Sequence, residues 1–128
     1  EVQTILSAGA GGSTKLVAKV REIAGGKPAF CTGDFNSNQN TEAYKTIAGS
    51  GILADSYVRC PSKTNGDWPT YNGYKYISTP PAAASRIDHV FVTPKDTKVV
   101  SWRIVNNSYN RKYPSDHFPV VIEWSLAE

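Results

Sequence analysis

Cysteine, histidine and methionine are scarce in this sequence: its 128 residues include two cysteines, two histidines and no methionine. Cys31 and Cys60 form no CxxC pair and have no spacing typical of a metal site. Cys31 falls in a predicted buried strand, where we interpret it as packing. A disulfide between the two cysteines stays open, as does the redox compartment. Because the first residue is Glu1, we expect a processed product or a piece of a longer protein.

Long apolar runs are also absent. No stretch approaches the roughly 20 residues that a membrane helix requires, and no basic segment followed by an apolar one opens the chain. The sequence therefore predicts no transmembrane segment and shows no secretory signal. It leaves the localisation open, because a signal region would lie outside this chain.

Blocks of like charge are missing as well. Lysine and arginine total 14 against 11 acidic residues, which gives a formal charge of +3 spread along the chain. This balance fits an anionic substrate such as a phosphate ester, but it does not by itself indicate nucleic-acid binding. The length predicts one domain with a core of its own.

The first half of the sequence predicts two helices and a strand. Residues 1–12 are glycine-rich and are expected to be flexible, and Ser13 is the predicted N-cap of a helix over 14–24. A short buried strand is predicted over 28–32. Thr41 is expected to cap a second, short helix that ends at the glycines from residue 49.

The second half predicts a long loop followed by strands. Residues 56–85 are rich in Pro, Gly, Ser, Thr and Tyr and are expected to form a long excursion with short hairpin-like pieces. Strands are predicted over 87–92, 99–105 and 117–124. A helix, a strand, a helix and then several strands indicate a mixed α+β domain.

The first candidate catalytic or metal-binding residues lie directly after the first predicted strand, in the motif Gly33-Asp34-Phe35-Asn36. Asp34 and Asn36 are two apart, so in extended backbone their side chains point the same way. They would place a base or metal ligand beside an amide donor. The alternative is an Asx-turn that closes a loop.

A second motif is Arg86-Ile87-Asp88-His89-Val90-Phe91-Val92, in which an aspartate enters an apolar strand. Alternation puts Asp88 on the side of the valines, where a buried carboxylate needs a partner such as Arg86 or a histidine. His89 lies on the opposite face and is interpreted as a structural histidine.

The third motif is Tyr113-Pro114-Ser115-Asp116-His117-Phe118-Pro119-Val120, with an adjacent Asp-His pair where a strand begins. The Asp116 carboxylate would suit a hard cation, and the His117 imidazole would transfer a proton or bind a phosphoryl oxygen.

Taken in this order, the three motifs resemble the endonuclease/exonuclease/phosphatase superfamily, which includes DNase I-like and exonuclease III-like nucleases, sphingomyelinases and inositol-polyphosphate 5-phosphatases. The resemblance runs from about Leu16 to Trp124. It implies a DNase I-like four-layer α/β sandwich, of which this chain, residues 1–128, would be the C-terminal portion. That portion would supply roughly one mixed or antiparallel sheet with its flanking helices.

The resemblance also implies a reaction: hydrolysis of a phosphodiester or phosphomonoester by activated water, with Mg²⁺ or Mn²⁺ as cofactor. By similarity, Asp34 would position the attacking water and help hold the metal, and Asn36 would bind the phosphate and hold Asp34. Asp116 would belong to the metal site. His117 would contact the scissile phosphate, with Asp88 orienting its imidazole.

The sequence departs from the family upstream of Asp34. Only Glu1 and Glu22 are acidic there, and neither has the context of the family's principal metal-binding glutamate; no histidine precedes His89. We therefore expect the N-terminal half of the domain to be a missing partner, and self-association through an uncovered apolar face is a hypothesis. The alternative function is a non-catalytic binding or structural module that retains the fold.

The substrate class stays open among nucleic acid, a phospholipid headgroup and a sugar or inositol phosphate. The long loop combines aromatic and basic residues that would stack on a base, a sugar or a headgroup, although packing within the loop is the simpler interpretation. These residues are Arg59, Lys63, Trp68, Tyr71, Tyr74, Lys75 and Tyr76.

Overall fold

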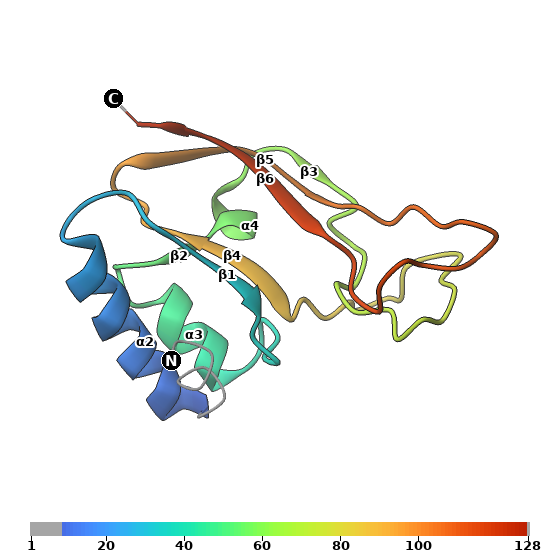
Figure 1. Cartoon of the computed structure of the whole chain (residues 1–128), viewed down its shortest axis with the longest axis horizontal. Coiled ribbons are helices and arrows are strands. Elements are labelled where there is room, and N and C mark those ends of the chain that lie inside the picture. The colour runs from blue at the N-terminus through green and yellow to red at the C-terminus, as the bar shows by residue number, and fades with distance from the viewer. Residues whose placement is uncertain (1–8, 128) are drawn as a thin grey trace.

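In the computed structural model, which describes residues 9–127, two small β-sheets lie face to face and two helices cover the outer face of one of them (Figure 1). The first sheet has the strand order β1-β4-β2 and the second has the order β3-β5-β6. We expected roughly one sheet from this chain. Instead the chain crosses between two three-stranded sheets, with residues 93–96 connecting β4 in the first sheet to β5 in the second.

Helix α2 spans Gly9–Ala24 and therefore begins earlier than predicted. The predictions of a flexible segment over residues 9–12 and of an N-cap at Ser13 are wrong; residues 1–8 lie outside the described residues. Ser13 is buried inside the helix, where it packs near Ala43 and Ile47 of the second helix. Glycine disfavours a helix interior by about 1 kcal/mol relative to alanine, so packing overrides local propensity here.

The Thr41 cap is confirmed: its side chain accepts a hydrogen bond from the backbone of Tyr44, and helix α3 runs over Glu42–Ala48. Strand β1 spans Phe30–Asp34, and of its residues only Cys31 is buried. The predicted buried strand is therefore an edge strand.

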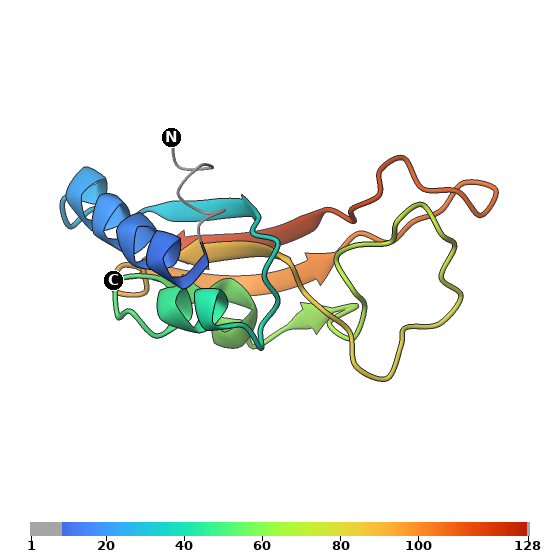
Figure 2. The same cartoon turned by 90° about the horizontal axis from the view of Figure 1, so that it is seen from below.

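Strand β2 (Ala54–Asp55) lies just before the segment predicted as a loop, and the segment itself contains two short elements, α4 (Ser56–Arg59) and β3 (Lys63–Thr64). Each is four residues or fewer, too short to give a periodic sequence pattern. From residue 65 to residue 87 the chain has no helix or longer strand. This loop and the one over 105–119 extend from the same end of the sheets (Figure 2).

The three predicted strands are present as β4 (Asp88–Val92), β5 (Thr97–Ile104) and β6 (Val120–Leu126). Strands β1 and β2 both pair antiparallel with β4, whereas β5 pairs parallel with β3 and antiparallel with β6. Strand β6 begins later than predicted because Pro119 has no N–H to donate and the residues before it bond to the loop around Thr70.

Each layer boundary has its own apolar core. One lies between helices α2 and α3 and the first sheet, with Leu16, Ile47 and Phe91 fully buried. The other lies between the two sheets and is built around Trp102 and Val92. Both cysteines are buried and free. Within residues 9–127, no helix is long and apolar enough to cross a membrane.

Candidate active site

The pairing of β1 with β4 places two carboxylates opposite each other. Asp34, the last residue of β1, is the cross-strand partner of Asp88, the first residue of β4. The bond from the Phe35 backbone N–H to the Ile87 carbonyl, 2.8 Å, extends the pairing one step beyond the strands. Like charges directly opposite in an antiparallel pair destabilise a sheet, so this arrangement calls for a positive neighbour.

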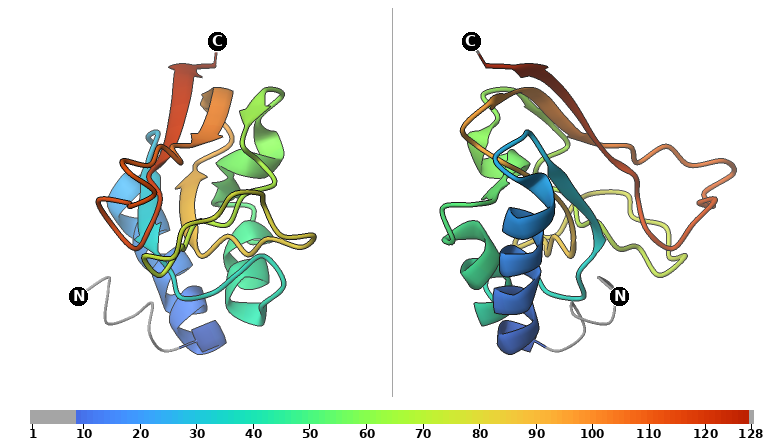
Figure 3. Two further views of the ribbon diagram at one scale, coloured as in Figure 1. Left: turned by 90° about the vertical axis from the view of Figure 1, so that its right-hand side faces the viewer. Right: turned by 60° about the vertical axis from the view of Figure 1, so that its left-hand side comes forward.

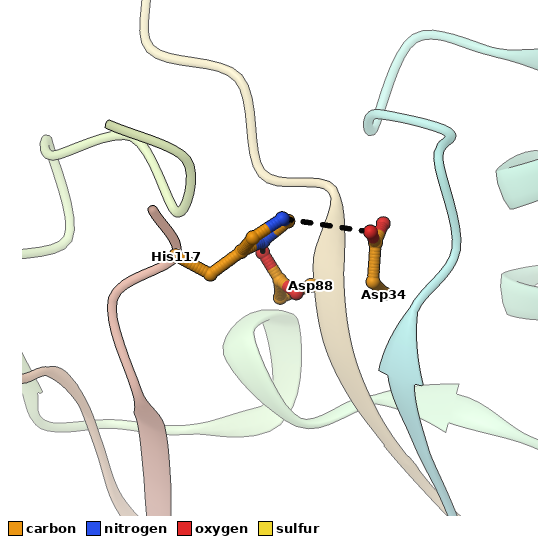
Figure 4. A group of neighbouring side chains, drawn as sticks. All are labelled: Asp34, Asp88 and His117. Atoms are coloured by element: carbon orange, nitrogen blue, oxygen red, sulfur yellow. Dashed lines mark hydrogen bonds and ion pairs between the residues drawn. The ribbon is translucent and has the colours of Figure 1, made fainter. Parts of the chain in front are cut away.

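The positive neighbour is His117, which lies in the loop before β6 and extends its imidazole toward Asp34 and Asp88 (Figure 4). Its Nδ1 lies 2.8 Å from Asp88 Oδ2, and its Nε2 lies 3.6 Å from Asp34 Oδ2. Because an ionised carboxylate only accepts, Nδ1 carries the proton in this bond. The imidazole is thereby oriented with Nε2 toward Asp34 and solvent.

The site is partly open to water. The side chains of Asp34, His117 and Asp88 are 37%, 27% and 17% exposed, respectively, so Asp34 is the most accessible of the three. A hollow of about 260 Å³ lies beside them, between β1 and the start of β6, and its wall includes Thr32 and Pro119. This space admits a small anion or a hydrated cation.

The environment stabilises a charged imidazole at His117. The hydrogen bond to Asp88 is the largest cause that raises the pKa of His117 above its usual value, and the charges of Asp88, Asp34 and Asp116 act in the same direction. Desolvation by partial burial opposes the shift and is the smaller effect. His117 is therefore suited to donate a proton or a charged hydrogen bond from Nε2.

Asn36 forms the turn that was one of the alternatives for the first motif. Its backbone N–H donates to Asp34 Oδ1 at 2.8 Å, and its φ of 49° lies in the left-handed region that asparagine tolerates. The Asn36 side chain is exposed. The turn fixes Oδ1 of Asp34 and leaves Oδ2 facing His117.

Asp116 lies apart from the other predicted ligand. The described residues contain one group of acidic and histidine side chains whose ligand atoms lie within 4.8 Å of one another, and it consists of Asp34, Asp88 and His117. The backbone carbonyl of Asp116 accepts hydrogen bonds from Asn72 and Gly73. Its charge acts on His117 without joining the cluster.

His89 and Arg86 belong to the packing behind the site. His89 is buried, its Nε2 lies 2.8 Å from the carbonyl of Ser37, and burial lowers its pKa below the usual value. Arg86 was one of the two partners predicted for Asp88, but it does not pair with Asp88. It forms an ion pair with buried Asp55 at 3.6 Å and stacks on the ring of Tyr57.

Sequence reasoning did not predict the contacts through which residues of the long loop hold the site together. Thr70 and Asn72 are buried and bond to the segments around Asp88 and Asp116, and Tyr71 pairs with His117 through an isolated bridge. The ring of Tyr71 also packs edge-on against the His117 imidazole, with 5.1 Å between ring centroids. No local pattern in the sequence marks these contacts, which join residues 18 to 46 positions apart.

Comparisons with known proteins agree on the fold. A mannosyl-6-phosphatase of Bacteroides thetaiotaomicron superposes with a TM-score of 0.79 at 31% identity, over 91% of this chain and 45% of that one. The catalytic domain of human Nocturnin, solved with bound sulfate, superposes with a TM-score of 0.63 at 23% identity, over 92% of this chain and 41% of that one, and supports the fold alone. Nocturnin of Drosophila melanogaster is 27% identical over an alignment of 138 positions, which covers 87% of this chain and 21% of that protein.

The superpositions show the fold class: the chain forms part of a DNase I-like α/β sandwich, as predicted. It spans less than half the length of these two solved structures. The sequence model of the Endonuclease/Exonuclease/phosphatase family matches residues 12–117. The chain therefore belongs to that family, whose members hydrolyse phosphate esters, and the predicted resemblance is confirmed.

Proposed function

We propose that the protein containing this chain is a metal-dependent phosphoesterase that uses activated water, with Asp34, Asn36, Asp88 and His117 as its site residues. One observation carries the proposal. Asp34 at the end of β1 faces Asp88 at the start of β4, and the His117 imidazole lies between the two carboxylates. Membership of a family of phosphate-ester hydrolases supports it.

Each of these residues has a role that follows from its contacts. Asp88 holds the His117 Nδ1 proton, so Nε2 is free to donate to a phosphoryl or leaving-group oxygen. The Asn36 backbone N–H holds one oxygen of Asp34, whose other oxygen is free to orient the attacking water. The Asn36 side-chain amide, which is exposed, would bind a phosphate oxygen.

The donor set fits Mg²⁺ or Mn²⁺. Mg²⁺ is typically held by one or two carboxylates, with water and substrate phosphate completing an octahedron. Asp34 is the accessible carboxylate and would hold the ion; Asp88 is engaged with His117. Asp116 would contribute through its charge or through water, since it lies outside the cluster. A bound ion would neutralise charge on the phosphoryl oxygens.

For the substrate, we favour a phosphomonoester such as a sugar phosphate. A solved relative whose name states a substrate class, mannosyl-6-phosphatase, is 31% identical and superposes with a TM-score of 0.79. Tyr71, which packs against His117, is exposed, as are Tyr74 and Tyr76 of the same loop, and exposed aromatic rings suit the apolar faces of sugars.

The test is hydrolysis by the full-length protein that contains these residues, with p-nitrophenyl phosphate and bis-p-nitrophenyl phosphate in parallel and Mg²⁺ added or chelated. We expect Asp34→Ala and His117→Gln to lower kcat by about 10²- to 10⁴-fold, whereas Asp67→Ala, which removes an exposed aspartate from the long loop, leaves it unchanged. Full activity in Asp34→Ala would contradict the assignment. Preference for the diester would redirect the substrate toward nucleic acid or a phospholipid.

One observation favours the alternative of a non-catalytic binding module for this chain by itself. Glu22, the acidic residue before Asp34 that the structure describes, lies exposed on α2 and pairs with Lys19 at 3.7 Å, so it does not join the site. Phosphate binding by the 128-residue chain, without Mg²⁺-dependent turnover in the full-length protein, would establish that alternative.

A further inference from the structure

Thr70 is fully buried although it lies in the long loop, and it forms four hydrogen bonds with two separate parts of the chain. Its backbone N–H donates to the carbonyl of Ser85 at 3.2 Å, and its own carbonyl accepts from the N–H of Phe118 at 2.8 Å. Its Oγ1 accepts from the N–H groups of Ile87 and Asp88, at 2.9 and 3.2 Å. A single residue thus joins the start of β4 to the residue after His117.

The Thr70 hydroxyl supports β4 at the end where the strand pairs with only one other strand of its sheet. Strand β2 pairs with β4 only at Phe91 and Val92, so at Asp88 the strand has one neighbouring strand, β1. Thr70 Oγ1 takes the place of a further strand by accepting from two successive backbone N–H groups. Without an acceptor there, the start of β4 would lose the contact that fixes the Asp88 backbone.

The residues that follow Thr70 hold the third motif. Tyr71 forms the isolated bridge with His117, and buried Asn72 donates its backbone N–H to the Asp116 carbonyl at 2.7 Å. The Asn72 side chain donates to the Ser115 carbonyl at 3.1 Å. The segment over 70–72 therefore sets the positions of both partners in the Asp88–His117 hydrogen bond.

We propose that Thr70 is a positioning residue of this site: its buried hydroxyl fixes Asp88 and its carbonyl fixes the segment of His117, so that the 2.8 Å hydrogen bond between the two is held ready before substrate binds. This inference rests on the proposed hydrolytic function. Thr70 touches neither the substrate nor the metal in this role, and it acts through Asp88 and His117.

The test compares Thr70→Val with Thr70→Ser in the full-length protein. Valine keeps the shape and removes the acceptor, whereas serine keeps the hydroxyl. We expect Thr70→Val to lower kcat by about 10²-fold, as small misplacements of catalytic groups do, with KM little changed, and Thr70→Ser to restore most of kcat. Thr93→Val is the matched control, because Thr93 Oγ1 also accepts a backbone N–H, from Ala29 at 2.9 Å, at the opposite end of β4.

A second readout does not depend on turnover. The Nδ1 proton of His117, held by Asp88, should give a slowly exchanging downfield NMR signal that is lost in Thr70→Val and retained in Thr70→Ser and Thr93→Val. Retention of the signal and of kcat in Thr70→Val would overturn the inference, as would an equal loss of kcat in Thr93→Val. A wild-type protein without hydrolytic activity would contradict the proposed function, and the NMR signal would then decide the role of Thr70.

Discussion

At the scale of single residues, the site is governed by how two facing carboxylates are kept together. Asp34 and Asp88 are cross-strand partners, and the His117 imidazole lies within reach of both. A protonated imidazole relieves the repulsion between the carboxylates, and a divalent cation would do the same. Proton occupancy of His117 and metal occupancy of the site are thus expected to compete.

The role of Asp88 is tested by Asp88→Asn. Because the hydrogen bond from His117 to Asp88 is the main cause of the raised pKa of His117, we expect the variant to shift that pKa downward. The measurement is NMR titration of the His117 ring in metal-free protein, with Asp67→Asn as the control for loss of an exposed aspartate. An unchanged titration midpoint in Asp88→Asn would show that Asp88 does not set the protonation of His117.

The two histidines are predicted to give opposite pH dependences of stability. Burial lowers the folded-state pKa of His89, although Asp55, Asp88 and the Ser37 carbonyl oppose the shift, and Arg86 adds to it. The unfolded chain therefore binds a proton first, and the free energy of unfolding should fall as pH drops below about 6.5. The pKa of His117 is raised, so its contribution is complete below about 6.5 and is lost as pH rises through the folded pKa.

This pair of effects can be separated by urea unfolding at several pH values. We expect His89→Gln to flatten the loss of stability below pH 6.5 or so, and His117→Gln to remove the loss above it. The chain contains no other histidine, so these are its only side chains with an ordinary pKa in this range. A pH profile of His89→Gln identical to that of the wild type would refute a neutral, buried His89.

At the scale of elements, the cap of α3 connects local sequence to the packing behind the site. Tyr44 of this helix donates its hydroxyl to Asp55 at 2.6 Å and packs its ring against His89. We expect Thr41→Ala to lower the free energy of unfolding by about 1 kcal/mol, the usual cost of losing an N-cap, as measured by urea unfolding. Thr46→Ala, within the same helix, is the control and should cost less, because its hydroxyl bonds only to the carbonyl of Glu42.

The elements that could be predicted from the sequence are those whose signals are local. Thr41 capped its helix as expected, and the alternating residues from Asp88 onward formed a strand with His89 and Asp88 on opposite faces. The start of α2 was not predictable, because glycine propensity opposes a helix that packing against α3 stabilises. The role of Thr70 was not predictable either, since its partners are distant in sequence.

At the scale of the whole molecule, one side of the sandwich is open. Strands β1 and β6 are each an edge strand of their sheet, and they lie on the same side of the molecule (Figure 3). There Phe30 packs on Trp124 with ring centroids 4.6 Å apart. Both aromatic side chains remain substantially exposed, at 38% and 43%. Exposed edges that carry large apolar residues favour association with another chain or segment.

The inner apolar face that we expected to be uncovered is packed between the two sheets of this chain. The hypothesis of self-association is therefore transferred to the exposed strand edges, where it leads to a prediction for the 128-residue chain alone. We expect it to form dimers or larger species through this side, which would bury Phe30 and Trp124, and we expect Trp124→Lys to shift the chain toward the monomer. Size-exclusion chromatography with light scattering over a dilution series measures this. Val58→Lys is the matched control, because Val58 is 68% exposed on α4 and belongs to neither edge strand. A chain that is strictly monomeric at all concentrations would contradict the prediction. Equal dissociation in both variants would contradict it too, because substitution of Trp124 should weaken the dimer more than substitution of Val58 only if the interface includes the β1 and β6 edges.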